Sequence, residues 1–141
     1  MIKKNQNYIY NSTIRSVFNK IYKKYPKNIF LKNSLTSSKE ERNAYTYKDV
    51  KLLINKNIIF FKTNNFIIGE RIAVMIGNTA EYFILKLSLN YYGLSCVPIN
   101  MELSTKEIQY ILSNSNSKYI ICLNQNLNYV KNILIRKIKK K

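Results

Sequence analysis

Short apolar runs alternate with helical patterns through the middle of the chain. Apolar residues fill positions 72–76, 96–99 and 119–122, and short unbroken runs of this kind are typical of strands buried on both faces of a parallel sheet. Between them, residues 80–91 and 105–112 place apolar side chains at i, i+3, i+4 and i+7, the spacing of an amphipathic helix. The pattern predicts an α/β fold, with an open parallel sheet built from consecutive βαβ units.

Polar residues mark where these two helices begin and end. Asn78 stands three residues before Glu81, and Ser104 stands three residues before Glu107. This is the spacing of a capping box, in which each side chain bonds to the backbone N–H of the other residue. Gly93 follows the first helix at the position where a left-handed residue ends it. We therefore expect helices that begin after Asn78 and after Ser104.

The segment between residues 28 and 61 predicts a hairpin and a long helix. Residues 28–32 and 44–45 flank a charged turn and are typical of a short antiparallel strand pair. Thr46 and Asp49 then repeat the capping-box spacing before a helix that extends to about Phe61.

Amphipathic helices are also predicted near both ends of the chain. Residues 14–25 carry one apolar stripe, which Pro26 ends, and lysines occupy the other face. We expect this helix to dock on the sheet, with a helix lying on a membrane surface as the alternative. Residues 127–138 are again helical in period and run into a basic end. Such a basic amphipathic tail is able to bind anionic lipid or nucleic acid, and the alternative is a covering helix of the sheet.

The net charge of +17 ordinarily suggests a nucleic-acid partner, but its distribution speaks against one. Residues 69–122 hold 4 basic and 4 acidic residues, whereas residues 1–68 hold 14 and 3, and residues 123–141 hold 6 and 0. Only 4 of the 24 basic residues are arginine, the residue favoured for gripping phosphate. We interpret the lysine excess as the effect of A- and T-rich codons on surface positions, with a selected basic patch as the alternative.

Candidate catalytic chemistry is sparse in this sequence. The chain has no histidine, which removes the usual base for nucleophile activation and most zinc sites. Cys96 and Cys122 each lie inside an apolar strand pattern, so we expect buried, reduced packing residues. The acids that stand at expected helix starts or in the charged turn are Asp49, Glu81, Glu107, Glu40 and Glu41. The sequence therefore predicts no catalytic, cofactor-binding or metal-binding residue.

The order of these motifs resembles the N-terminal region of the AMP-forming acyl-CoA synthetases, the adenylate-forming ligases, over residues 13–125. That family has a Thr-Tyr helix start, a Gly-Asp-x-Val-Ala strand, an Asn-x-x-Glu helix and a later Pro-Ile/Leu-Asn strand end. The matching positions are Thr46-Tyr47, Gly69-Glu70-Arg71-Ile72-Ala73, Asn78 with Glu81, Gly93, Pro98-Ile99-Asn100, Glu107 and Ser115. Glu70 departs from the usual Asp. Each match is a cap, a turn or a strand end, so no functional residue is carried over.

The resemblance implies an enzyme that makes an acyl-adenylate from a carboxylic acid and ATP and then passes the acyl group to coenzyme A. It places the glycine-rich phosphate loop and the catalytic lysine beyond residue 141, and the 3 glycines of this chain are isolated from one another. We therefore expect residues 1–141 to form a single partial domain, an incomplete N-terminal subdomain that is inactive alone. ATP, Mg²⁺ and CoA would belong to the complete enzyme, with no cofactor for this chain.

Further expectations concern the ends of the chain, its location and its partners. The lysines at 139–141 favour an accidental stop in an adenine run, so a truncated or split synthetase is expected, with the remainder as a separate partner chain. Residues 1–12 and 137–141 are expected to be disordered. The absence of a signal peptide or an apolar membrane span favours the cytoplasm. The alternative function is a small basic α/β module that binds nucleic acid or an acidic partner, and no specific nucleic acid is expected otherwise.

Overall fold

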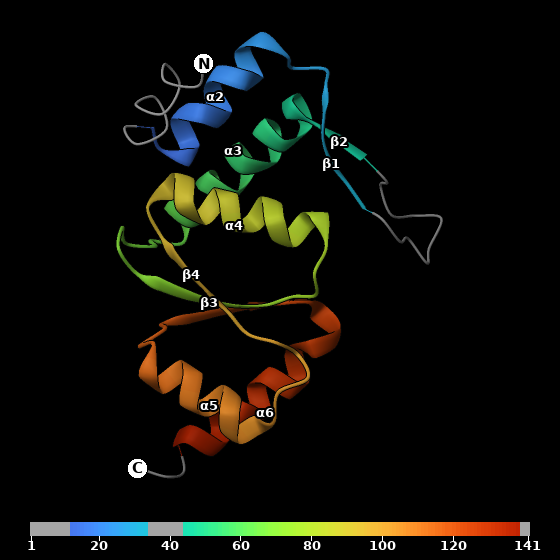
Figure 1. Cartoon of the computed structure of the whole chain (residues 1–141). Helices are drawn as coiled ribbons and strands as arrows, with labels where there is room; N and C mark the ends of the chain where they lie inside the picture. Colours follow the sequence, from blue (N-terminus) through green and yellow to red (C-terminus); the bar gives the residue numbers. More distant parts are fainter. Residues whose placement is uncertain (1–11, 34–43, 139–141) are drawn as a thin grey trace, which may run out of the picture.

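The computed structural model of the chain describes residues 12–33 and 44–138 (Figure 1). The elements are α2 (Ile14–Lys24), β1 (Ile29–Lys32), β2 (Ala44–Thr46), α3 (Tyr47–Thr63), β3 (Arg71–Met75), α4 (Ala80–Tyr92), β4 (Ser95–Pro98), α5 (Thr105–Asn114), β5 (Tyr119–Cys122), the 3-10 turn η1 (Asn124–Asn126) and α6 (Leu127–Ile138). The predicted α/β class, the hairpin and the three parallel strands are confirmed.

Two expectations concern residues that lie mainly outside these ranges. The segments expected to be disordered were residues 1–12 and 137–141; Ser12 is described, and residues 137 and 138 belong to α6. The charged turn with Glu40 and Glu41 lies wholly outside the described residues.

The parallel sheet has the strand order β4-β3-β5, so β3 is its central strand. Ile72 pairs with Cys96 on one side and with Tyr119 on the other. The connection from β3 to β4 runs through α4, and the connection from β4 to β5 runs through α5 and passes β3. Because the two crossovers move in opposite directions across the sheet, their common right hand places α4 and α5 on opposite faces. Figure 1 shows this arrangement.

Each face of the sheet has its own apolar core, because alternate residues of β3 point to opposite sides. Ile72 and Val74 pack with Leu89 of α4 and Phe61 of α3 on one face. The core on the other face joins β3 to α5 and α6 and contains Ala73, Met75, Ile99, Ile108, Leu112, Val130 and Ile133. Both faces of the central strand are therefore dry, as its unbroken apolar sequence predicts.

A third core lies farther from the sheet, among α2, α3, α4 and the hairpin. Its buried members include Phe18 of α2, Tyr45 of β2, Val50 and Ile54 of α3 and Ile84 of α4. The prediction that the first helix docks on the sheet is wrong. α2 packs on α3 and α4, which already cover that face of the sheet, so its apolar stripe is buried in a second layer.

The local capping signals decide where three of the helices begin. Thr46 and Asp49 form a capping box at α3, with Thr46 N–H donating to Asp49 Oδ2 at 2.9 Å. Ser104 and Glu107 form the second box at α5, where Ser104 N–H donates to Glu107 Oε2 at 2.8 Å. The cap predicted for α4 is wrong by one residue, because the hydroxyl of Thr79, instead of Asn78, accepts from the backbone of the first turn.

The backbones of Gly69, which precedes β3, and Gly93, which follows α4, approach each other closely. Gly93 ends α4 with φ of 95°, a conformation in which a side chain is strained. A Cβ atom at Gly93 would also stand 3.0 Å from the Ile68 side chain. Gly69, with φ of 90°, donates its N–H to the Gly93 carbonyl oxygen at 2.8 Å. The turn before β3 is thereby fixed against the turn before β4.

Candidate functional site

The carboxyl ends of the three parallel strands are the first place to look for a site. In open α/β sheets, ligands bind outside these ends, where neighbouring strands send the chain to opposite faces. β3 leads into α4 on one face, whereas β4 and β5 lead into α5 and α6 on the other face. The edge consists of three loops, residues 76–79, 99–104 and 123–126, which we call the carboxyl edge.

Two amide side chains of the carboxyl edge, those of Asn100 and Asn126, bind to neighbouring groups of the same edge. Asn100 Oδ1 accepts from the N–H of Glu102 at 3.1 Å, which closes a local turn. Asn126 donates from Nδ2 to the sulfur of Met101 at 3.3 Å. A Cβ atom at Gly77 would lie 3.6 Å from Met101 Cε, so the methionine side chain reaches across from the β4 loop to the β3 loop. The amides therefore hold the loops together and do not converge on an open site.

The N-terminus of α4, which is the natural anion site of such an edge, is already occupied by side chains of the protein. Thr79 Oγ1 accepts from the N–H of Tyr82 at 3.2 Å. Asn33, at the end of β1, accepts at Oδ1 from the N–H of Ala80 at 3.0 Å. Because two of the free N–H groups of the first turn are satisfied in this way, this helix end offers little of the cradle that a phosphate group requires.

Glu81 in the first turn of α4 also has a structural partner. Its carboxylate accepts a hydrogen bond from the hydroxyl of Tyr45, a buried residue of β2. Partial burial raises the pKa of this carboxyl, but the hydrogen bonds from Tyr45, from its own backbone N–H and from Thr79 outweigh burial and hold the pKa below its usual value. Glu81 is thus an ionised clamp between the hairpin and α4. A general acid would need a raised pKa.

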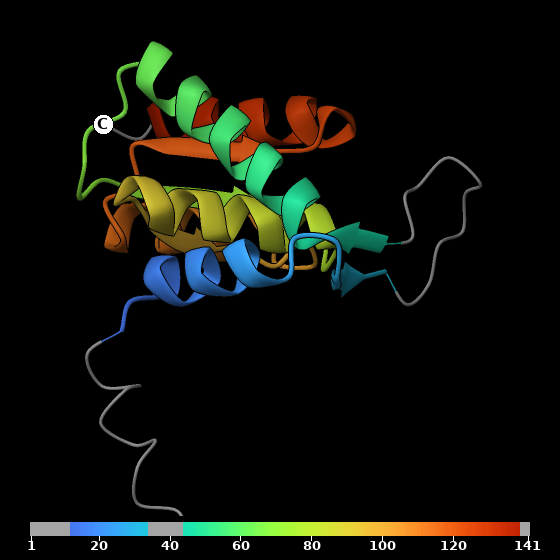
Figure 2. The same cartoon turned by 90° about the horizontal axis from the view of Figure 1, so that it is seen from above.

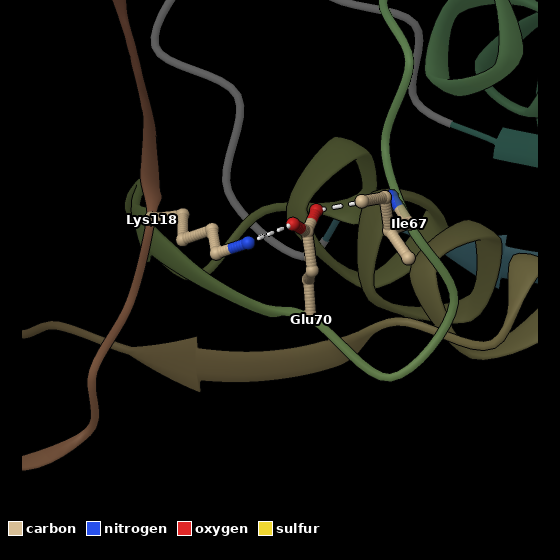
Figure 3. A network of polar contacts seen from close by, with 3 residues as sticks. All are labelled: Ile67, Glu70 and Lys118. Atoms are coloured by element: carbon tan, nitrogen blue, oxygen red, sulfur yellow. Dashed lines mark hydrogen bonds and ion pairs between the residues drawn. The ribbon is translucent and has the colours of Figure 1, made fainter.

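The opposite end of the sheet carries the polar network of Figure 3. Glu70 accepts from Lys118 Nζ at 2.7 Å and from the backbone N–H of Ile67 at 3.0 Å. The hydrogen bond from Lys118 and then that from Ile67 lower the pKa of Glu70, and the same ion pair raises the pKa of Lys118. The network ties the turn before β3 to the start of β5. The family-like Gly-Glu motif is therefore structural at this position.

The residues matched by sequence are spread over both ends of the sheet. Asn78, exposed to solvent, and Asn100 lie at the carboxyl edge. Ser115 ends α5 at the opposite end, where its carbonyl oxygen accepts from Arg71 Nη1 at 3.2 Å. The other matched positions are caps, turns and strand ends. The structure does not bring the matched residues together into one constellation, and that no functional residue is carried over stays a prediction.

The two cysteines are free thiols within strands, as expected, but they are half-buried where full burial was predicted. Both lie on the outer strands of the sheet, where one side of each strand lacks a neighbour among the described residues. Burial raises the pKa of the Cys96 thiol, which neighbouring Lys86 and Tyr82 only partly offset, and burial also raises the pKa of Cys122. Within the described residues, no group of three or more Cys, Asp or Glu side chains is placed to hold a metal ion.

An apolar hollow of about 780 Å³, which the sequence reasoning missed, lies over α2 and α4. A second hollow of about 470 Å³ shares Ile14, Phe83 and Leu87 with it and extends to Cys96 of β4. Lys20 and Lys86 are the charged residues that line these two hollows. The sequence signal for it is the apolar stripe of α2, of which Ile14 and Val17 are exposed and line the hollow. The lining of the larger hollow is mainly apolar, and the smaller hollow adds the Cys96 thiol.

No helix in the described ranges, residues 12–33 and 44–138, has both the length and the apolar character needed to cross a membrane.

Comparison with known proteins gives the family. A family model described as "AMP-binding enzyme" matches residues 18–141. The long-chain-fatty-acid–CoA ligase FadD13 of Mycobacterium tuberculosis is 32% identical over 76 residues, which are 54% of this chain and 15% of that protein. A crotonobetaine/carnitine–CoA ligase of Shigella flexneri is 29% identical over 79 residues, which are 56% of this chain and 15% of that protein. The chain thus spans about 15% of the length of these curated relatives.

Solved structures give the fold. The N-terminal subdomain of NpsA from Klebsiella oxytoca superposes with a TM-score of 0.68 at 22% identity, over 77% of this chain and 27% of that one. AB3403, a four-domain nonribosomal peptide synthetase bound to AMP and glycine, superposes with a TM-score of 0.71 at 16% identity, over 82% of this chain and 8% of that one. Because the family model matches most of the chain and the fold is that of adenylate-forming enzymes, the chain belongs to the AMP-binding enzyme family, as an N-terminal portion of an AMP-forming ligase.

Proposed function

We propose that this chain is the N-terminal structural part of a carboxylic acid–CoA ligase. The complete enzyme would join the acid to AMP, release pyrophosphate and transfer the acyl group to CoA. Family membership supports the adenylate-forming step, and the names of the two curated relatives, both CoA ligases, support CoA as the acceptor. These relatives act on different acids, so the proposal is made for the class of carboxylic acids, with fatty acids as the first to test.

The observation that carries the proposal is that side chains of the protein itself already occupy the polar groups of the carboxyl edge. Asn100 binds the backbone of Glu102, Asn126 binds Met101, and the first turn of α4 is occupied by Thr79 and Asn33. The described residues also lack a carboxylate cluster for Mg²⁺. The residues present therefore do not fit ATP, Mg²⁺ or CoA, and we propose that these ligands are held by the rest of the complete enzyme. By the same reasoning, the chain alone is inactive.

The partner that this proposal requires is the remainder of the synthetase, as a continuation of the chain or as a separate polypeptide. The cytoplasm is the proposed location, because ATP and CoA are available there. The free thiols of Cys96 and Cys122 suit a reducing compartment.

Exchange of labelled pyrophosphate into ATP tests the absence of activity. The purified chain is incubated with ATP, Mg²⁺ and a panel of acids that includes palmitate and carnitine, with FadD13 and a long-chain fatty acid as the positive control. We expect acid-dependent exchange from FadD13 and none from the chain. Exchange by the purified chain with any acid would show that it carries its own phosphate site and would overturn this part of the proposal.

A second candidate function rests on the net charge of +17, which attracts nucleic acid without any fitted site. If scattered lysines attract nucleic acid only nonspecifically, binding to DNA or RNA falls steeply between about 50 and 200 mM salt and does not depend on base sequence. Fluorescence anisotropy with two duplexes of unrelated sequence and one single strand measures both properties. Sequence-selective binding at physiological salt would favour the basic module over the ligase part.

A further inference from the structure

The two hollows over α2 and α4 belong to one apolar groove. Ile14, Phe83 and Leu87 line both hollows, which therefore meet at these residues. The larger hollow, of about 780 Å³, extends along α2 to Ile21, and the smaller, of about 470 Å³, extends to Cys96 of β4. Both volumes lie in the range of pockets that bind small molecules. We call the two hollows together the α2–α4 groove.

The rims of the α2–α4 groove are apolar side chains that the described residues leave exposed. Phe18 of α2 packs into the core shared with α3 and α4 and is 5% exposed. Ile14 and Val17, in the turn before it, are 57% and 43% exposed, and Phe83 of α4 is 40% exposed. In Figure 2, α2 lies at the margin of the molecule beside α4. The core therefore uses only one side of the apolar stripe of α2, and the other side is available to a ligand.

The charges around the α2–α4 groove have one sign. Lys20 lines its larger part and Lys86 its smaller part, and no Asp or Glu is among the described residues that line either. The first acidic residue of the chain is Glu40, so α2 carries none. Glu81, the one acid of α4, binds Tyr45 of β2. The groove therefore favours a ligand that is apolar along its length and negatively charged at one point.

Lys86 is well placed to meet the charged end of such a ligand. It lies in the turn after Phe83, and its side chain lines the smaller hollow together with Asn90. Among the described residues, Lys86 forms no ion pair with a carboxylate. Burial raises the pKa of the Cys96 thiol in the same hollow, and the positive charge of Lys86 opposes this rise. The charge of Lys86 thus acts inside the groove.

The length of the larger hollow suits an alkyl chain. Its wall follows α2 from Ile14 to Ile21, which is about 10 Å at the rise of an α-helix. The inner surface consists of uncharged side chains, those of Phe18, Phe30, Tyr47 and Leu87. Each methylene group that leaves water along this surface favours binding, because the gain follows the apolar area buried. A ligand as short as a single aromatic ring would leave much of the hollow unfilled.

We propose that the α2–α4 groove binds the anion of a fatty acid, with the alkyl chain in the larger hollow and the carboxylate at Lys86. The site shares no residue with the carboxyl edge. It therefore lies apart from the chemistry of the proposed ligase and holds a fatty acid without activating it. The proposal rests on the shape and charge of the groove and does not depend on the ligase assignment.

Two other occupants fit the α2–α4 groove less well. A second copy of the chain carries the same net charge of +17, which opposes its approach. A membrane surface meets side chains that project from a protein. Phe18 and Leu87, in contrast, line the groove although each is at most 7% exposed. The recessed part of the lining is within reach of a single inserted chain.

The test adds decanoate, labelled with ¹³C at the carboxyl carbon, to the full chain below the concentration at which decanoate forms micelles. NMR of the label measures binding, and the methyl and amide signals of the protein locate it. We expect saturable binding at a single site, with shifts centred on Ile14, Val17 and Leu87. Butyrate, which has the same carboxylate on a shorter chain, should bind at least about tenfold more weakly, because fewer methylene groups leave water.

Substitution of Lys86 tests the position of the carboxylate. Lys86→Gln should weaken the binding of decanoate by about two- to fivefold and leave that of uncharged decanol unchanged. The bound carboxyl should titrate at a lower pH in wild type than in Lys86→Gln, because the ammonium group stabilises the anion. Lys106→Gln, at an exposed position of α5, makes the same change of net charge and should alter neither ligand.

Substitution of Ile14 tests the position of the chain. Ile14→Asn should weaken the binding of decanoate and decanol alike, by about fivefold, because it removes part of the shared apolar wall. Leu52→Asn on α3, outside the groove, is the matched control and should bind both ligands as wild type does. Both side chains are more than half exposed, so neither change should unfold the protein, and circular dichroism verifies this.

Three outcomes overturn the proposal. The first is the absence of saturable binding, or equal losses from Lys86→Gln and Lys106→Gln, which would assign the attraction to net charge. The second is a shift of the Ile14 and Phe83 signals that grows with protein concentration without any ligand, which assigns the groove to a second copy. The third is binding to anionic vesicles that Ile14→Asn abolishes, without binding of decanoate, which assigns the groove to a membrane.

This readout needs neither ATP nor CoA. A negative result therefore removes the fatty-acid site and leaves the ligase assignment standing, whereas pyrophosphate exchange by the chain alone removes the proposal of inactivity and leaves the fatty-acid site standing.

Discussion

The two faces of the parallel sheet are covered to different depths. On one face, α4 lies between the sheet and a second layer, with Leu89 toward the sheet and Ile84 and Tyr91 in the outer core. On the other face, α5 and α6 form a single layer whose outer side meets solvent, as the exposed Tyr110 of α5 shows. A side chain in the two-layer region is held from both sides, whereas α5 and α6 are free to shift toward a vacated space.

The difference also explains the sequence of α4. A helix with one buried side needs a single apolar stripe, but α4 buries Leu89 on the side opposite to its main stripe, which consists of Ala80, Ile84, Leu87, Ser88 and Tyr91. α5 buries only Ile108 and Leu112, which lie on one side. The breadth of the apolar surface of a helix therefore indicates how many layers enclose it.

The strongest test of this comparison uses two isoleucines of equal burial. Ile54 of α3 lies in the two-layer region and Ile133 of α6 in the single layer, and each is at most 1% exposed. Replacement by alanine leaves a cavity whose cost depends on how far the surroundings collapse. We expect Ile54→Ala to lower the free energy of unfolding by about 4 to 5 kcal/mol and Ile133→Ala by about 2 to 3 kcal/mol. Urea unfolding followed by circular dichroism measures both.

Equal losses from the two isoleucine variants, or a larger loss from Ile133→Ala, would show that the second layer adds no rigidity. A change of the denaturant slope in either variant would instead report an altered unfolded state.

A smaller effect is expected from the polar contact inside the two-layer region. Ser88 is fully buried, accepts from Asn57 Nδ2 at 2.9 Å and donates to the Ile84 carbonyl oxygen at 2.7 Å. Ser88→Ala leaves the Asn57 amide without this acceptor and should cost about 1 to 2 kcal/mol. Combined with Asn57→Ala, the cost should fall short of the sum by about 0.5 to 1 kcal/mol. Additive costs would contradict a direct coupling between α3 and α4.

A hydrogen bond on the single-layer face is the matched control for the loss of stability in Ser88→Ala. Gln109 of α5 donates from Nε2 to the Ile133 carbonyl oxygen at 3.0 Å in a partly buried position. Because solvent can replace this bond, Gln109→Ala should cost only about 0.5 kcal/mol.

The last test depends on pH and concerns the clamp between the hairpin and α4. Glu81 has a pKa held below its usual value, so its contribution to stability is complete above the unfolded pKa of about 4.3 and is lost as pH falls through the folded pKa. Tyr45→Phe removes one of the hydrogen bonds responsible. The variant should be less stable by about 1 kcal/mol near pH 7, with a smaller difference near pH 3.

Urea unfolding at several pH values measures the difference between wild type and Tyr45→Phe. Tyr110→Phe, at an exposed position of α5, is the control and should match wild type at every pH. A Tyr45→Phe deficit that stays constant down to about pH 3 would assign the loss to packing and not to the Glu81 carboxylate.

The parts of the fold that depend on local interactions were predictable from sequence. The capping boxes at Thr46 and Ser104 involve partners three residues away, and the strands are marked by their own apolar runs. The start of α4 was predicted one residue early: Thr79 caps the helix, and Glu81, the expected partner of Asn78, bonds to Tyr45, which is 36 residues distant in sequence. The stripe of α2 predicted burial, but periodicity carries no information about which surface buries it.

The candidate site likewise has features that could be predicted from the sequence and features that could not. The structural role of the matched motifs followed from residue types and spacing. The contacts that close the carboxyl edge could not be predicted from the sequence. They depend on Met101 reaching Gly77 and on Asn33 bonding to Ala80 N–H, 47 residues away, and such contacts exist only once the topology is formed.

The central position of β3 has a consequence for the nascent chain on the ribosome. β4 directly follows α4 in sequence, so it is available to pair with β3 before β5 has been translated. At a synthesis rate of about 5 to 20 residues per second, the second edge of β3 waits roughly 1 to 5 seconds for Tyr119–Cys122 to appear. During that interval Ala73 and Met75 face water on a strand that is only half paired, and this transient surface is open to a ribosome-associated chaperone.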